Sequence, residues 1–220
     1  GGVSYEYGTI FIPVQNQKLN ASELFTFLGD VANESHININ AVNTGLNDGI
    51  DLGSNNFTPV KMPQVLVVAG PGVNSTEAGE LWYNLERLAG ISPTLAEPER
   101  LSRLNLSRYT HIILPDGDYR GWKETEVTQL RQWVQQGGVL WGQKRGAAWL
   151  VDAKLLQAGV WSTQEMNKLI PQNELRYADK EQLAGQQRIA GAIFSAELDL
   201  SHPLTFGIPR RELPVFKNSN

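Results

Sequence analysis

The spacing of two glycines marks the first candidate for chemistry. The run Gly142, Gln143, Lys144, Arg145, Gly146 follows an apolar segment and precedes a helical pattern. It matches the nucleophile elbow G-x-Nu-x-G, a strained strand-to-helix turn in which glycines avoid clashes where the backbone folds sharply. Lys144 stands at the nucleophile position, and an ammonium group cannot attack an amide as a thiolate does. We therefore predict a degenerate elbow, with no catalytic residue.

Two roles are open to Lys144. A lysine forms a Schiff base only when burial lowers its pKa and a carbonyl substrate is present, and the sequence indicates neither. The simpler hypothesis is an ion pair with a carboxylate. Glu80 is the predicted partner, because its helix starts at a neighbouring loop.

Other polar residues follow neighbouring strands at the same predicted edge of the sheet. Because ligands of open α/β sheets bind at the carboxyl ends of the strands, these residues form a candidate pocket for a small polar or anionic ligand. Its members are Gly72, Glu80, Asp116, Gly117 and Lys144. A dinucleotide site is not predicted, since Ser75 replaces the third glycine of G-x-G-x-x-G. Tight turns explain the same glycines without any ligand.

Metal and sulfur chemistry have little support in the sequence. The chain has no cysteine, which removes thiolate nucleophiles and sulfur-based metal sites. Its histidines are His36, His111 and His202, and none is followed three residues later by glutamate, as a His-x-x-Glu zinc pair requires. We predict no metal site and no cofactor in this chain.

Composition narrows the class of partner. The chain is 41% hydrophobic and 19% charged, as globular proteins are. A formal charge of −4 without a long basic block argues against a nucleic-acid partner. No apolar run approaches the ~20 residues that a membrane-spanning helix needs. The sequence makes no prediction of oligomeric state.

Strand-like and helical segments alternate along the chain. Strands are predicted at 9–14, 37–42, 64–70, 111–114, 139–142 and 189–198. Helical spacing covers 24–31, 74–88, 127–134 and 147–156, whereas 160–187 has no clean period. This order predicts an α/β fold with a mostly parallel sheet flanked by helices on both faces, a three-layer, flavodoxin-like arrangement.

The tryptophans divide into two groups. Four fall on apolar faces of the predicted elements and are expected in the core, namely Trp82, Trp133, Trp141 and Trp149. Trp122 and Trp161 lie in less periodic segments. We predict that these two belong to a surface that packs against a neighbouring domain.

Four stretches of the sequence resemble a known family. They read "VAGPGVNSTEAGELWYNLERLAGI", "LSRYTHIILPDGDYRG", "LRQWVQQGGVL" and "IAGAIFSAELDLSHPLTFGIP". Together they resemble the class I glutamine amidotransferase-like domain that follows the catalytic domain in certain zinc carboxypeptidase-like proteins. The segment from "GTIFIPV" through "NTGLNDGIDLGS" resembles the part that joins the two domains. The resemblance covers nearly the whole chain.

This resemblance implies a domain organisation. Residues 1–62 would form a βαβ segment and linker to an upstream peptidase domain, and 63–220 an amidotransferase-like domain truncated at its C-terminus. The parent would be a metallocarboxypeptidase, a hydrolase that removes C-terminal residues from peptides. It would use one zinc ion, bound by a His-x-x-Glu pair and a later histidine in the missing peptidase domain.

Two functions remain after this comparison. The first is a non-catalytic accessory or interaction domain whose partner is the upstream peptidase domain of the same chain. The alternative is a binding domain for a small polar or anionic ligand in the degenerate crevice. Active amidotransferases usually place a glutamate two residues after the acid-base histidine, whereas Leu204 follows His202 here. We therefore expect His202 to shape a turn.

Overall fold

The computed structural model describes residues 2–5, 8–169, 176–186 and 191–217 of the chain. The chain divides into two compact units, Val60–Gln172 and the combination of Gly1–Pro59 with Asn173–Asn220. The boundary between residues 59 and 60 lies close to the one that the sequence places after residue 62. The boundary between residues 172 and 173 was not predicted, because we expected one domain over residues 63–220.

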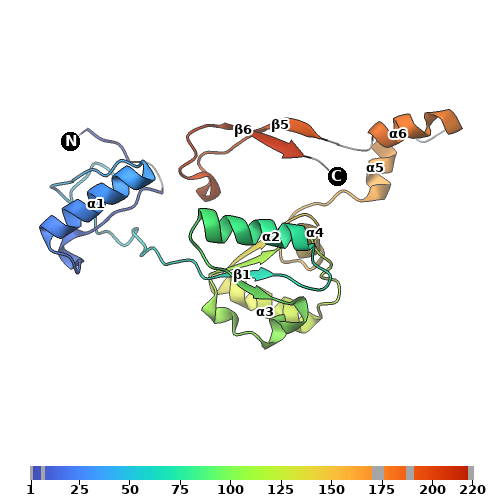
Figure 1. Ribbon diagram of the computed structural model, residues 1–220, viewed down its shortest axis with the longest axis horizontal. Coiled ribbons are helices and arrows are strands. Elements are labelled where there is room, and N and C mark those ends of the chain that lie inside the picture. Colours follow the sequence, from blue (N-terminus) through green and yellow to red (C-terminus); the bar gives the residue numbers. More distant parts are fainter. Residues whose placement is uncertain (1, 6–7, 170–175, 187–190, 218–220) are drawn as a thin grey trace. The chain divides into compact units, whose positions relative to one another are not determined.

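A four-stranded parallel sheet forms the centre of the Val60–Gln172 unit. Its strands are β1 (Val65–Val68), β2 (Thr94–Ala96), β3 (His111–Leu114) and β4 (Val139–Gly142), in the order β2-β1-β3-β4. The flanking α-helices are α2 (Ser75–Tyr83), α3 (Glu124–Gln135) and α4 (Arg145–Asp152) (Figure 1). The predicted α/β class and parallel sheet are thus confirmed. Strand β2 is a three-residue edge strand that the sequence analysis missed.

Alternate residues of the central strands enter two apolar clusters, because successive side chains of a strand point in opposite directions. Leu66 of β1 packs in one cluster with Leu130 of α3. Val67 belongs to the other, packed with Leu81 of α2. Strands covered in this way read as continuous apolar runs, which is why β1 and β3 could be predicted.

Short helical segments complete the connections in this unit. A π-helical turn, η2 (Asn84–Leu88), continues α2, and two 3-10 helices, η3 (Pro98–Arg103) and η4 (Leu106–Arg108), lead from β2 to β3. Each 3-10 helix buries one leucine, Leu101 and Leu106, in the larger apolar cluster. These connections therefore add to the core.

An aromatic cluster supports the loop after β3. Trp122 packs against Tyr119 and Trp149, with ring centroids 5.1 and 5.0 Å away. Its indole N–H donates to the carbonyl of Pro98 at 2.9 Å. Trp122 is therefore partly buried against the core of its own unit, and its role in docking stays a prediction.

The other tryptophans give a mixed result. Trp133 and Trp149 are buried, as predicted. Trp82 and Trp141 are 47% and 53% exposed, so their assignment to the core is wrong. Helical and strand periodicity placed both on the apolar side of their elements, but no described part of the chain covers them there. Trp161 is exposed, and its role in docking stays a prediction.

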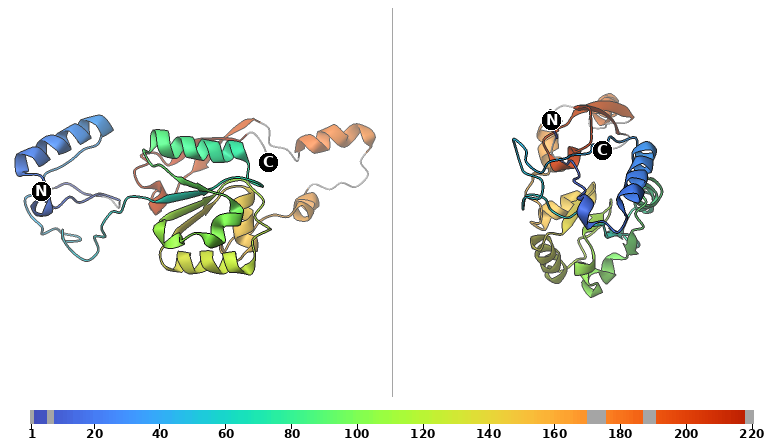
Figure 2. Two further views of the ribbon diagram at one scale, coloured as in Figure 1. Left: turned by 60° about the horizontal axis from the view of Figure 1, so that its bottom comes forward. Right: turned by 90° about the vertical axis from the view of Figure 1, so that its left-hand side faces the viewer.

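The second unit contains one long helix and a hairpin. Helix α1 (Ala21–Ser35) begins with a capping box between Asn20 and Glu23. Strands β5 (Ala192–Glu197) and β6 (Glu212–Lys217) form an antiparallel pair, drawn in orange and red in Figure 2. The predicted strand 189–198 corresponds to β5, although residues 189 and 190 lie outside the described residues.

Two predicted strands of this unit are wrong. Residues 9–14 and 37–42 contain no strand, and the first of these segments leads into a 3-10 helix, η1 (Val14–Asn16). Their β-branched residues suggested strands, but a strand needs another strand to pair with. The regular element between the two segments is the helix α1, which cannot serve as that partner. The proposed βαβ unit therefore reduces to its helix.

The segment 160–187 is more regular than its sequence suggested. It contains α5 (Thr163–Leu169), η5 (Tyr177–Asp179) and α6 (Lys180–Gln186). The start of α5 has a reciprocal cap, in which Ser162 and Glu165 bond each other's backbone N–H groups at 2.8 and 3.2 Å. Capping chemistry therefore marked this helix where hydrophobic periodicity did not. Within the described ranges, no helix combines the length and apolarity needed to cross a membrane.

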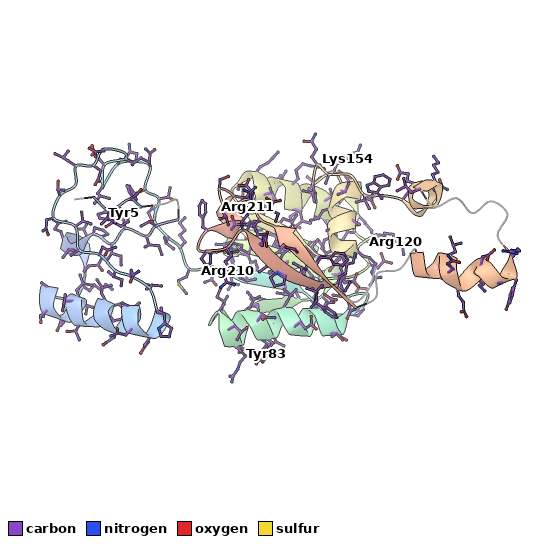
Figure 3. All side chains as sticks on the ribbon, turned by 90° about the horizontal axis from the view of Figure 1, so that it is seen from above. Tyr5, Tyr83, Arg120, Lys154, Arg210 and Arg211 are labelled. Carbon is purple, nitrogen blue, oxygen red and sulfur yellow. The ribbon has the colours of Figure 1, made fainter. Side chains whose placement is uncertain are left out.

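The turn that follows helix α4 contains a lysine in the left-handed conformation. Lys154 has φ 54°, and the following Leu155 N–H bonds the carbonyl of Leu150 at 2.9 Å. The Lys154 side chain projects outward there (Figure 3). This is the arrangement in which glycine usually closes a helix.

Replacement of this lysine by glycine should stabilise the unit. Glycine adopts positive φ without steric strain, so we expect Lys154→Gly to raise the free energy of unfolding by about 0.5–1 kcal/mol. Chemical denaturation monitored by circular dichroism would measure it. The control Ala148→Gly, inside α4, should lower stability by about 1 kcal/mol. Equal loss in both variants would contradict the proposed cap.

Candidate functional site

The turn between β4 and α4 has the geometry of a strained elbow. Lys144 immediately precedes α4, at φ 46° and ψ −116°. A side chain is rarely found at such angles unless the surrounding structure imposes them. The turn lies where β4 ends, at the carboxyl edge of the parallel sheet.

Close backbone packing imposes this conformation. A Cβ atom on Gly146 would lie 2.5 Å from the carbonyl oxygen of Leu114, at the end of β3. A Cβ atom on Gly142 would lie 2.7 Å from the backbone nitrogen of Ala147. Both positions therefore need glycine, because α4 begins in contact with the strand ends.

The ammonium group of Lys144 is bound by Glu77, in the first turn of α2. The predicted partner, Glu80, is therefore wrong. Glu77 lies one helical turn closer to the strand edge, and its carboxylate reaches the elbow. The hydrogen bond to Glu77 raises the pKa of Lys144, and Asp116 and Glu80 add electrostatic effects in the same direction.

A second ion pair lies beside the first. The guanidinium group of Arg145 donates to both carboxylate oxygens of Asp116, at 2.7 and 3.2 Å. The backbone N–H of Arg145 points to the same carboxylate at 3.4 Å. Asp116 thus acts as a counter-ion at the start of α4, where a negative charge is favoured. Its hydrogen bond to Arg145 lowers the pKa of the Asp116 carboxyl, although partial burial opposes this effect.

Backbone hydrogen bonds connect the remaining pocket residues. The N–H of Asn74 donates to the carbonyl of Asp116 at 2.8 Å, and the N–H of Asp118 donates to the carbonyl of Gly72 at 2.9 Å. Gly117 forms an isolated antiparallel bridge with Val73. The loops after β1 and β3 are therefore joined to each other. The structure brings Gly72, Asp116 and Gly117 together, while Glu80 lies outside the direct contacts of Lys144.

The charged side chains at the elbow are paired with one another. Both cations already hold a carboxylate, and the side chains of Glu77 and Asp116 are only 20% and 15% exposed. Those of Lys144 and Arg145 are 52% and 62% exposed. The amide oxygen of Gln143 is buried without a hydrogen-bond partner within the described residues. A buried polar atom without a partner is unusual in a folded protein.

His111 and His202 make local contacts. The Nδ1 atom of His111 lies 2.8 Å from the hydroxyl of Thr110. The Nδ1 atom of His202 accepts the backbone N–H of Leu204 at 3.2 Å, in a turn of the other unit. Across the described ranges, no group of three metal-ligating side chains comes together.

Sequence reasoning missed three residues of this site: Asn74, Glu77 and Arg145. Asn74 caps α2, because its side chain accepts the backbone N–H groups of residues 76 and 77 at 3.0 and 3.4 Å. The available signal for Glu77 was its place in the first helical turn, because that turn starts at the carboxyl edge of the sheet. Arg145 follows Lys144 directly and faces Asp116.

Comparison of the chain with protein-family models, with curated proteins and with solved structures finds no match in any of the three.

The elbow glycines provide a direct stability test. We expect Gly146→Ala to lower the free energy of unfolding by about 1–3 kcal/mol, because its new methyl group would overlap backbone atoms of β3. Gly79→Ala is the matched control, since a Cβ atom at Gly79 of α2 meets nothing within 4 Å. That control should gain about 0.5–1 kcal/mol from helix propensity. Denaturant titration of both variants would show whether their signs differ.

The Asp116 ion pair predicts a pH dependence. Because its folded-state pKa lies below the unfolded value, Asp116 stabilises the fold fully above about pH 4 and loses this contribution as pH falls through the folded pKa. Asp116→Asn should therefore be less stable at pH 7 and lose less stability between about pH 4 and pH 2. Thermal unfolding across this range would measure it. Asp152→Asn, at an exposed aspartate of α4, is the matched control for the substitution itself.

Proposed function

We propose that this chain is a non-catalytic accessory or interaction domain of the class I glutamine amidotransferase-like type. Its sheet and flanking helices would form the flavodoxin-like, three-layer arrangement of that class. The observation that carries the proposal is the ammonium group of Lys144, at the strained elbow position and paired with Glu77.

The chemistry of an amine at this position supports the loss of catalysis. Amide hydrolysis through an elbow needs a nucleophile with a free lone pair beside a base. Glu77 raises the pKa of Lys144, so this amine is protonated at neutral pH. Schiff-base chemistry would require the opposite shift. The elbow residues therefore serve the structure of the turn in this proposal.

In this proposal, the two ion pairs hold the turn after β4 against its neighbours. Lys144–Glu77 joins the turn after β4 to the start of α2, and Arg145–Asp116 joins it to the loop after β3. Three loops at the carboxyl edge are thereby connected through side chains of opposite charge. We propose that this edge is a fixed surface of an accessory domain, with no open active site.

The proposed parent follows from the sequence resemblance. In it, this chain is joined to an upstream zinc carboxypeptidase-like domain that removes C-terminal residues from peptides. That domain would be the partner of this chain, and zinc would belong to the peptidase domain. We assign no cofactor, nucleic-acid partner or membrane span to this chain.

A hydrolase assay tests the absence of catalysis. The whole chain should release neither ammonia from glutamine nor a C-terminal residue from peptides, with or without added zinc. Lys144→Met should give the same blank and lower the free energy of unfolding by at most about 1 kcal/mol, because the ion pair is half exposed. Lys154→Met is the matched control, a lysine that also has positive φ. Hydrolysis by the wild type that Lys144→Met abolishes would overturn the proposal.

One observation favours the second candidate, a binding domain for a small polar or anionic ligand. The side chains of Lys144 and Arg145 are 52% and 62% exposed, and Gln143, which precedes them, has a buried amide oxygen with no hydrogen-bond partner among the described residues. Phosphate, glutamine and glutamate at millimolar concentration are the probes for a thermal-shift screen. A rise in melting temperature that is lost in Lys144→Met and kept in Lys154→Met would favour this candidate over the first.

A further inference from the structure

Strand β4 is an edge of the parallel sheet without the usual protection. Among the described residues, it pairs with β3 on one side and with no strand on the other. Edge strands commonly carry lysine, proline or a bulge, which prevent pairing with a further strand. The nine residues from Gln135 to Gln143 contain no charged residue and no proline.

The backbone groups at this edge can be assigned from the hydrogen bonds to β3. The N–H of Val139 donates to Thr110 and that of Gln143 to Leu114, each at 2.9 Å. Alternate residues of a strand direct their backbone groups to the same side, so the N–H and C=O groups of Trp141 also point toward β3. The N–H and C=O groups of Leu140 therefore point outward, away from the sheet.

An uncovered apolar surface lies along the same edge. Val139 and Trp141 are aligned with His111 and Ile113 of β3, so their side chains lie on the same side of the sheet as Ile113. Ile113 is covered by the cluster that includes residues of α2. Val139 and Trp141 are 47% and 53% exposed. Helix α2 thus protects the central strands and leaves β4 open on this side.

We propose that two copies of this chain pair through β4, antiparallel to each other, about a two-fold axis at Leu140. In this register, each Leu140 donates its N–H to the other's carbonyl and accepts in return. Val139 then lies opposite Trp141 of the second copy, and the same pair occurs twice. A β-branched residue beside an aromatic one is a favourable cross-strand pair.

The self-complementary register is the reason to assign a second copy as the occupant. A two-fold interface brings a surface against itself, so any charge at the axis would meet a like charge. The uncharged run around β4 avoids this repulsion. Because Val139 and Trp141 alternate with Leu140, the two-fold axis also places the Val139 and Trp141 side chains of both copies on one face. With only four residues per strand, the contact is small, and the association is weak and concentration-dependent.

Self-association of the whole chain tests this surface. Analytical ultracentrifugation over a range of concentrations should show a monomer–dimer equilibrium. Trp141→Glu should weaken it by about tenfold or more, since two carboxylates would enter the shared face. Trp82→Glu is the control, because this tryptophan of α2 is exposed to a similar extent and should leave the dimer unchanged. Circular dichroism would check that both variants fold. A wild type that stays monomeric throughout would overturn the proposal.

Disulfide trapping tests the register itself. Since the chain has no cysteine, single variants can be mixed without side reactions. Val139→Cys mixed with Trp141→Cys should form a covalent dimer, because a non-hydrogen-bonded antiparallel pair brings the two Cα atoms to ~4.5 Å. Each variant alone should not, as identical positions lie diagonally beyond disulfide reach.

The control for this experiment uses the other edge of the sheet. Leu95 of β2 is similarly exposed, so Leu95→Cys mixed with Val139→Cys should give no covalent dimer. A crosslink in that mixture would indicate head-to-tail pairing of β2 with β4 and would overturn the two-fold arrangement. Equal crosslinking in all mixtures would indicate random collision and would overturn it as well.

Discussion

The backbone contact between Gly146 and the end of β3 fixes the rest of the candidate site. Because α4 starts against Leu114, the chain must turn within a few residues of β4. That turn forces Lys144 into positive φ and directs Lys144 and Arg145 toward the neighbouring loops. The elbow is therefore a consequence of packing, and it does not depend on which side chain occupies its apex.

The charges at the elbow follow from this geometry. Two cations enter a region beside the starts of α2 and α4, where each helix favours a negative group. Glu77 and Asp116 supply that negative charge from within the chain, so the cations and the helix starts share the same two carboxylates. A site arranged in this way is already neutralised. An incoming anion would compete with these two carboxylates for the exposed donors of Lys144 and Arg145.

The sequence predicted the parts of the fold that packing dictates. Strands β1, β3 and β4 are continuous apolar runs, and α2 and α3 have one apolar stripe each, so their residues fixed the α/β class and the parallel sheet. The strand β2 was missed because a three-residue edge strand is too short for periodicity to show. The supposed strands at 9–14 and 37–42 failed because composition indicates strand propensity but not a pairing partner. In the candidate site, the glycine spacing predicted the turn, whereas the choice of Glu77 over Glu80 depends on how far α2 extends past the sheet.

The two units differ in how much apolar surface they bury. Among the described residues, Leu24 is the one buried side chain of the Gly1–Pro59 and Asn173–Asn220 unit, and all six residues of β6 are exposed. The Val60–Gln172 unit holds all the other buried hydrophobic residues. Protection from amide hydrogen exchange follows buried contacts, so the slowest-exchanging amides belong to β1 and β3. We therefore expect the heat-capacity change of unfolding to come mainly from the Val60–Gln172 unit.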